Sequence, residues 1–187
     1  MRLSKRAEFG LTNEFVICHI GRFSKLKNHS FVLSILKECL NKNENLKLLL
    51  VGDGELKDHV SQEIKDMCLE NHVIMTGNRG DIGGLLSASD VFVLPSLIEG
   101  FPVVTLEAQA NGLPTLVSDT LTTEIMITDS ITMLSLESPS IWADHINQIT
   151  SNTHKTDNIQ KLRHAGFDIK LASCDLLKFY CKQLEIT

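Results

Sequence analysis

Short apolar runs alternate with amphipathic stretches over the first two thirds of the chain. The runs predict buried strands at 15–20, 46–51, 73–76, 91–94 and 115–118, with a weaker one at 131–136. Helical patterns separate them at 28–41, 54–69 and 82–87, and a further helix begins at Pro102 and ends at Gly112. Because the strands are apolar throughout rather than alternating, both faces of their sheet are expected to be covered. The pattern predicts a Rossmann-like, doubly wound α/β fold: a parallel sheet of about six strands with helices on both faces.

The rest of the chain adds no second series of strands and helices. At 187 residues, of which 43% are hydrophobic, the chain can bury one good core and is short for two. We therefore expect a single domain over 1–187, with 1–14 as a leading linker and 140–187 as C-terminal helices. Those helices are expected at 141–150 and 158–184, with the polar stretch 150–155 between them.

Charge and cysteine content narrow the class of protein. The formal net charge is -5 and there is no run of Lys or Arg, which argues against a nucleic-acid or anionic-membrane surface. No apolar stretch reaches the ~18–20 residues of a membrane span, and residues 1–6 lack the apolar segment of a signal peptide. The five cysteines are odd in number and form no close pair, so we expect a reduced cytoplasmic protein with neither a disulfide nor a zinc site.

Two loops are expected to meet at one edge of the sheet. In the common strand order 3-2-1-4-5-6, the first and fourth strands are neighbours, and the loops after them open a crevice for a ligand. The first of these loops carries Arg22, Lys25 and Lys27. A guanidinium binds phosphate oxygens in a planar, bidentate way and an ammonium adds a point charge, so this loop favours a phosphate ligand. The alternative is that the three cations are ordinary surface charge.

The second loop leads into a helix whose first turn lacks a capping side chain. Phe101 precedes the helix and offers no acceptor, which leaves free the backbone N–H groups of Val103, Val104 and Thr105. Free amides at the positive end of a helix dipole favour an anion, and a phosphate is the usual ligand.

Two carboxylates flank this helix start. Glu99 precedes it, and Glu107 lies about five residues inside the helix, roughly 7 to 8 Å along the axis from the anion at ~1.5 Å per residue. This is about the reach from a pyrophosphate to the hydroxyls of its own ribose. The alternative is that Glu99 only complements the helix dipole and that Glu107 lies on a solvated face.

Three further features carry less information. Gly52-Asp53-Gly54 follows the second strand but lacks the third glycine of a dinucleotide fingerprint, so it predicts a tight turn. Gly77-Asn78-Arg79 follows the third strand, where exposed backbone could contact a base edge, although a plain turn explains it as well. His19 is expected to pack in the interior, and its place at a strand end leaves a role near the ligand open.

In their order and spacing, these motifs resemble a known family. They are similar to the donor-binding half of retaining GT-B glycosyltransferases with an E-x(7)-E motif, the group 1 or family 4 enzymes. The resemblance is dense over 15–118, and segments near 117–120 and 166–169 are similar to bacterial capsular and exopolysaccharide enzymes. The segments that carry it are His19-Ile20-Gly21-Arg22 with Lys27-Asn28, Leu49 through Leu56, Ser89 through Ser96, and Glu99 through Pro114.

The resemblance implies a role for most candidate residues. Arg22 and Lys27, together with Gly21, would bind the donor diphosphate and stabilise it as the leaving group, and Glu107 would bind the ribose. Glu99 would face the transferred sugar and act with the two cations in catalysis. The other implied donor contacts are the backbone of Gly100, Phe101 and Pro102 and the first-turn amides of Val103, Val104 and Thr105.

The resemblance also bears on the ligand. UDP is favoured as the nucleotide, and no metal or other cofactor is implied, because protein cations would offset the charge of the leaving diphosphate. The chain departs from the family at Leu121-Thr122-Thr123 before Glu124, where paired glycines are usual, so the resemblance implies no sugar contacts for that loop.

Function and partners follow as expectations. The implied reaction transfers a sugar, with retention, to a glycan or lipid-linked acceptor in surface polysaccharide synthesis. A complete enzyme of this kind also has an N-terminal acceptor domain, so the chain is expected to be a half enzyme with little or no activity alone. Any membrane contact would be made through that missing half. Alternatives are a non-catalytic nucleotide-sugar-binding module and a sugar-nucleotide epimerase.

The last helix carries a related expectation. In the family it usually crosses onto the missing half, so its apolar side chains are expected to be partly unsupported here and to drive homo-oligomerisation. These side chains are Leu176, Leu177, Phe179 and Tyr180.

Overall fold

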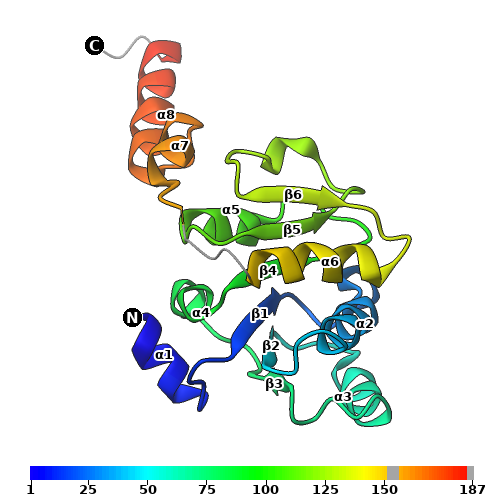
Figure 1. Cartoon of the computed structure of the whole chain (residues 1–187). Helices are drawn as coiled ribbons and strands as arrows, with labels where there is room; N and C mark the ends of the chain where they lie inside the picture. The colour runs from blue at the N-terminus through cyan, green and yellow to red at the C-terminus, as the bar shows by residue number, and fades with distance from the viewer. Residues whose placement is uncertain (151–155, 185–187) are drawn as a thin grey trace.

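The computed structural model describes residues 1–150 and 156–184, and its centre is a six-stranded sheet in the order β3-β2-β1-β4-β5-β6 (Figure 1). Every neighbouring pair of strands is parallel, which confirms the predicted doubly wound fold. Because the order reverses after β3, β1 and β4 lie side by side and form the switch point. The strands are β1 (Phe15–Ile20), β2 (Leu46–Val51), β3 (Val73–Met75), β4 (Val91–Leu94), β5 (Thr115–Ser118) and β6 (Ile131–Leu134).

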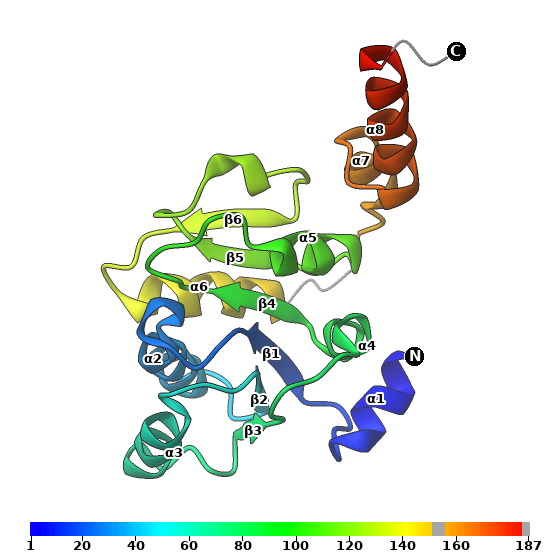
Figure 2. The same ribbon diagram turned by 180° about the vertical axis from the view of Figure 1, so that it is seen from behind.

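Helices cover both faces of this sheet (Figures 1 and 2). Along β1, Ile17 points into one core and Val16 and Cys18 point into the other, as the two-residue repeat of a strand requires. The first core is closed by α2 (His29–Leu40), α3 (Lys57–Asp66) and α6 (Pro139–Thr150), and the second by α4 (Ile82–Ala88) and α5 (Val103–Ala110). The sheet therefore reaches solvent mainly at its edges, where the loops lie.

The bounds of α5 matter most for the site. Pro102 was expected to be the first helical residue, but it is the N-cap, with φ -75° and ψ 91°, and Val103 is the first residue of the helix. At the other end Gly112 has φ +69°, and a Cβ there would lie 2.2 Å from the carbonyl oxygen of Thr156. Only glycine fits that position, which explains why the helix ends there.

Residues 1–14 are not a linker, and this corrects the sequence-based expectation. They contain α1 (Arg2–Glu8), which packs against α4. Arg6 is only 5% exposed, and its guanidinium donates to the carbonyl oxygens of Thr12, Glu14 and Ala88. Leu11 is buried in the second core and Phe9 packs against it, while the buried arginine is held by hydrogen bonds from its guanidinium. A charged residue in the interior of a helix is not a feature that hydrophobic patterning predicts.

The expected helix over 158–184 is in fact two, and this is a second correction. The chain turns at Gly166, where φ is +88°, between α7 (Ile159–His164) and α8 (Ile169–Gln183). Asp168 caps α8 by accepting from the N–H of Lys170 at 3.0 Å, and it pairs with Arg163. The polar separator expected at 150–155 lies outside the described residues from 151 onward.

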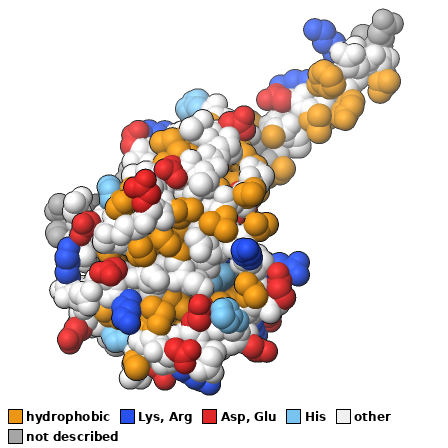
Figure 3. Space-filling model, turned by 90° about the vertical axis from the view of Figure 1, so that its right-hand side faces the viewer, with side chains coloured by type: hydrophobic (Ala, Val, Ile, Leu, Met, Phe, Trp, Pro, Cys, Tyr) orange, Lys and Arg blue, Asp and Glu red, His pale blue; other side chains and the backbone are white. Residues whose placement is uncertain are grey.

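Helix α8, the last helix of the chain, projects as an arm from the body of the domain (Figures 1 and 2). None of its residues is buried, and apolar side chains are exposed along this arm in Figure 3. Leu176, Leu177, Phe179 and Tyr180 are between 54% and 64% exposed, so they lack support in this chain, as expected.

Candidate functional site

The loops after β1 and β4 are bonded to each other at the switch point. The N–H of Leu97 donates to the carbonyl oxygen of Leu26 at 2.8 Å, and the side-chain amide of Asn28 donates to the carbonyl oxygen of Pro95 at 3.1 Å. Parallel strands place these loops at the same edge of the sheet, so the two segments that the sequence singled out form one surface.

Lys27 and Glu99 form an ion pair across these loops. The ammonium Nζ lies 2.5 Å from Oε1 of Glu99, and the side chains are only 19% and 14% exposed. Gly21 makes room for the stem of Lys27, because a Cβ at Gly21 would lie 2.9 Å from Cδ of the lysine. Two residues expected at the donor site therefore meet directly, and the stem of the lysine packs over the glycine at the end of β1.

Arg22 comes from the same loop as Lys27 but faces solvent. Its side chain is 73% exposed, and Nε lies 3.0 Å from Oε2 of Glu55, which is 54% exposed. Arg22 and Lys27, two of the three cations of this loop, are therefore each paired with a carboxylate in the structure. The Lys27 pair is largely shielded from water, whereas the Arg22 pair is not.

The start of α5 is only partly as expected. No side chain caps the helix, in agreement with the sequence argument. The N–H of Thr105, however, donates to the carbonyl oxygen of Pro102 at 2.9 Å, and its hydroxyl donates to the same oxygen at 2.7 Å. This amide is therefore engaged, which corrects the expectation for Thr105 and leaves Val103 and Val104 as the candidate donors to an anion. Gly100 is exposed in the turn that precedes them.

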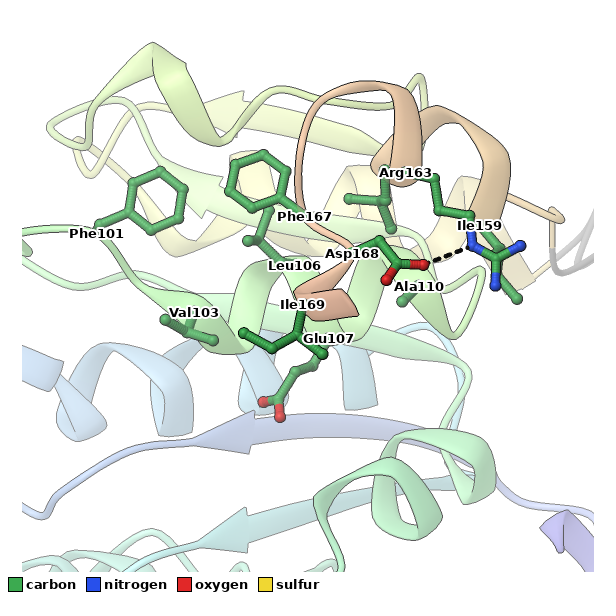
Figure 4. Close-up of a pocket in the computed structure, with 11 residues that line it drawn as sticks. Phe101, Val103, Leu106, Glu107, Ala110, Ile159, Arg163, Phe167, Asp168 and Ile169 are labelled. Carbon is green, nitrogen blue, oxygen red and sulfur yellow. Dashed lines mark hydrogen bonds and ion pairs between the residues drawn. The ribbon is translucent and has the colours of Figure 1, made fainter. Parts of the chain in front are cut away.

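Glu107 lies at a cavity of about 590 Å³ between α5 and the α7–α8 segment (Figure 4). Partial burial among apolar side chains raises the pKa of its carboxyl above the usual value. Arg163 and Asp168 form a 3.0 Å ion pair at the rim, and the Glu107 carboxylate points away from that pair. The other lining residues are Phe101, Val103, Leu106, Ala110, Ile159, Leu162, Phe167 and Ile169.

A second hollow, of about 370 Å³, lies where the loops after β1, β2 and β3 meet. Gly21 and Arg22 line it together with Asn78 and Arg79 from the loop after β3, so the structure brings this loop to the site. Gly77, from the same loop, does not line the hollow, and its carbonyl oxygen accepts the N–H of Gly52 at 3.0 Å. The rest of the wall consists of the apolar Ile20, Val51 and Ile82 together with Gly52 and Asp53 of the turn after β2.

Arg79 is fixed at the rim of this hollow. Nε and Nη2 donate to the two carboxylate oxygens of Asp81, each at 2.8 Å, and Nη2 also donates to Glu8 of α1 at 2.7 Å. The segment expected to be a linker thus supports the loop for which both a base contact and a plain turn were left open.

Two buried histidines lie beneath the cationic loop. His19 and His29 are 0% and 3% exposed, and their rings meet edge to face at 4.8 Å. Burial is the main cause that lowers the pKa of His19 to about 3 and that of His29 to about 4, so both are neutral at pH 7. His19 Nδ1 lies 3.0 Å from the carbonyl oxygen of Val93 and donates to it. His19 therefore packs in the interior, as expected.

Two findings concern metals and membranes. Among residues 1–150 and 156–184, no group of three His, Cys, Asp or Glu side chains is arranged to hold a metal ion. Over the same part of the chain, no helix is both long and apolar enough to cross a bilayer.

A family model described as "Glycosyl transferases group 1" matches residues 2–164, which is most of the chain. The chain belongs to this family. The resemblance inferred from the E-x(7)-E motif is thus confirmed, and the match begins within α1, in agreement with the place of that helix in the domain.

Curated relatives of this group 1 glycosyltransferase chain include two bacterial proteins. EpsF of Bacillus subtilis (strain 168), named as a glycosyltransferase, is 35% identical over 172 residues, which cover 90% of this chain and 45% of the relative. A UDP-Gal:alpha-D-GlcNAc-diphosphoundecaprenol alpha-1,3-galactosyltransferase of Escherichia coli is 41% identical over 110 residues, or 57% of this chain and 28% of that protein. The matched parts of this chain span less than half the length of these relatives.

Solved structures show the same fold. HepE of Anabaena in complex with UDP has a TM-score of 0.81 at 24% identity, covering 96% of this chain and 52% of that one. Sucrose-phosphate synthase of Thermosynechococcus elongatus has a TM-score of 0.84 at 18% identity, and the match covers 99% of this chain and 49% of that one.

Sequence reasoning about this group 1 glycosyltransferase chain missed several residues of the site. Asn28 stands in the sequence only as part of a motif, and nothing in the sequence indicates that it bonds to Pro95 or that Glu55 pairs with Arg22. His29 could have been found, because it interrupts the apolar face of the helix over 28–41. The contribution of 159–169 to the cavity at Glu107 left no signal in the sequence, because it depends on the turn between α7 and α8.

Proposed function

We propose that this chain binds the nucleoside-diphosphate sugar of a retaining glycosyltransferase, with UDP as the nucleotide. The observation that carries the proposal is the meeting of the cationic β1 loop, Glu99 and the uncapped start of α5 at the switch point of the sheet. In this fold class that place is where ligands bind.

The chemistry follows from the charges. Cleavage of the bond between sugar and phosphate places negative charge on the diphosphate, and donors fixed in advance stabilise that charge as it develops. Lys27 and Arg22 supply two cations, and the amides of Val103 and Val104 supply the positive end of a helix. In this proposal protein groups offset the charge of the leaving group and no metal is required.

The rest of the donor is assigned around these groups. Glu107 binds the ribose, and Glu99 faces the transferred sugar beside the exposed backbone of Gly100. The hollow between Arg22, Asn78 and Arg79 takes the base, because it offers apolar wall and backbone next to the phosphate groups. Retention of the anomeric configuration rests on the family alone.

Relatives support the nucleotide and the class of acceptor. The Escherichia coli relative acts with UDP-Gal on a diphosphoundecaprenol-linked sugar, by its name, and HepE was solved with UDP. We therefore propose a hexosyl transfer to a glycan or lipid-linked acceptor in surface polysaccharide synthesis. The cytoplasmic location expected from the cysteine content stays a prediction.

A second domain is part of this proposal. The matched parts of this chain span less than half of its curated relatives, and the apolar face of α8 lacks support. An acceptor-binding domain would cover that face, and until it does the chain is expected to transfer little or no sugar and to self-associate through α8. Sedimentation of the chain at rising concentration, with and without Leu177→Lys, measures the self-association.

Calorimetric titration with UDP, GDP and ADP tests the donor site. Selective binding of UDP that weakens in Glu107→Ala and in Arg22→Ala supports the proposal. Glu70→Ala and Lys37→Ala, exposed positions away from the site, are the matched controls and should bind as the wild type does. Failure of all three nucleotides to bind at millimolar concentration, or equal losses in site and control variants, would refute it.

A further inference from the structure

Asn28 has an unusual backbone conformation for its residue type. Its φ of 56° and ψ of 47° are left-handed, and it is one of two non-glycine residues with positive φ in the described part of the chain. Asparagine tolerates this region better than most L-residues do. The conformation lets the chain turn from the short 3-10 helix at Lys25–Lys27 directly into α2.

The side chain of Asn28 does not serve its own helix. Asn28 is the N-cap of α2, where such a side chain usually accepts from a backbone N–H, but it makes no capping bond. Its amide instead donates to the carbonyl oxygen of Pro95, at the end of β4, with a length of 3.1 Å. An asparagine at this position therefore joins the two loops of the site rather than stabilising the helix.

Lys27 is held on both sides by these contacts. The residue before it, Leu26, accepts from the N–H of Leu97, and the residue after it, Asn28, donates to Pro95. The backbone of Lys27 is thus fixed against the segment that leads to Glu99, and its ammonium reaches that carboxylate. Without the Asn28 bond, one of these two anchors is lost.

The next residue is anchored in the core. His29 is 3% exposed, stacks on Phe23 with ring centroids 4.2 Å apart, and meets His19 edge to face. The loop after β1 is therefore held by the packing of His29 in the core and by the hydrogen bond from Asn28 to Pro95. The position of Lys27 depends on both.

We propose that Asn28 is a positioning residue that holds Lys27 at the diphosphate site without itself contacting the donor. This inference rests on the proposed donor-binding function. Loss of one hydrogen bond of this kind should weaken binding of UDP by about 2- to 10-fold, provided that it acts through the lysine.

A double-mutant cycle in UDP affinity tests this proposal. Asn28→Gly keeps the left-handed backbone accessible and removes only the side-chain amide. We expect it to weaken UDP binding in the wild-type background and to have no further effect, within about twofold, when Lys27→Ala is already present. Asn41→Gly, at the other end of α2, controls for added chain freedom and should leave UDP affinity unchanged.

The outcomes separate this inference from the proposed function. If wild type binds UDP but the losses from Asn28→Gly and Lys27→Ala multiply, Asn28 acts independently of the lysine and the inference is wrong. A lower melting temperature with unchanged UDP affinity would also overturn it, since Asn28 would then be purely structural. Absence of UDP binding by the wild-type chain would overturn the proposed function and this inference together.

Discussion

Replacement of Glu99 by glutamine should tighten the binding of UDP, although the same change should impair sugar transfer. In the structure Lys27 is already paired with Glu99, at 2.5 Å and with both side chains largely shielded from water. A diphosphate that binds Lys27 must displace or share this carboxylate, and it must also approach its negative charge. Glu99→Gln keeps the shape of the side chain and removes both obstacles.

The size of the effect follows from the shielding of the pair. A hydrogen bond to a charged group contributes about 1.5–3 kcal/mol net, and a glutamine retains part of that contact with the lysine. We therefore expect a gain of about 1–2 kcal/mol, or roughly 5- to 30-fold in UDP affinity. The Arg22–Glu55 pair gives an internal comparison. Because it lies in solvent and is screened by water and salt, Glu55→Gln should change UDP affinity by about twofold at most.

Calorimetry at one fixed ionic strength measures both variants against wild type. The reasoning is refuted if Glu99→Gln binds UDP as weakly as wild type or more weakly, because the carboxylate would then help rather than oppose the lysine. Equal gains in the two variants would point to net charge alone, since both remove one negative charge from the same crevice.

Three further predictions concern stability, each measured by urea unfolding. Gly52→Ala should unfold the domain or leave it barely stable, because Gly52 has φ +136° and a Cβ there would lie 2.0 Å from the carbonyl oxygen of Gly21. Gly80→Ala is the control and should be tolerated, because the space around Gly80 is open. Equal losses of stability in the two variants would contradict the steric argument. Arg6→Ala should cost roughly 3 kcal/mol by leaving buried carbonyls unpaired, and a cost near zero would restore the linker interpretation of α1. Burial lowers the pKa of His29 to about 4 in the folded state, whereas its pKa in the unfolded chain is about 6.5, so the free energy of unfolding falls as the pH drops below ~6.5. His29→Phe should reduce the loss of unfolding free energy between pH 7 and pH 5 by up to roughly 2 kcal/mol. An unchanged dependence of stability on pH in this variant would contradict the burial argument.

The doubly wound fold and most element positions could be predicted from the sequence because the strands are continuously apolar. The strand order agrees with the common order of this fold class and does not follow from particular residues. β1, β2, β4 and β5 begin and end where the apolar runs do. Two predictions were wrong, the linker over 1–14 and the single helix over 158–184, because features other than the apolar pattern determine the structure of these segments. Helix α1 is anchored by the guanidinium of Arg6, and the break between α7 and α8 depends on one glycine within an otherwise helical pattern.

The candidate site could be predicted in part for a similar reason. The switch point follows from topology alone, so Lys27 and Glu99 could be placed at one edge of the sheet from the sequence. Their direct pairing could not, because it depends on the conformation of Asn28 and on the space left by Gly21. The engaged amide of Thr105 was missed because the hydrogen bond that uses it is made by the N-cap carbonyl, not by a side chain.

The pairing of Lys27 with Glu99 links the two halves of the proposed donor. The lysine is assigned to the diphosphate and the glutamate to the sugar, yet in the structure the two side chains are bonded to each other. A diphosphate that takes the lysine would therefore free Glu99 at the moment when the attached sugar arrives beside it. If this exchange operates, the binding of UDP alone breaks the Lys27–Glu99 ion pair, which lowers the affinity for UDP. A sugar attached to the UDP then forms a new contact with Glu99 and recovers part of that binding free energy. A nucleotide sugar should then gain more affinity over UDP in the wild type than in Glu99→Gln, and an equal gain in both proteins would show that Glu99 does not contact the sugar.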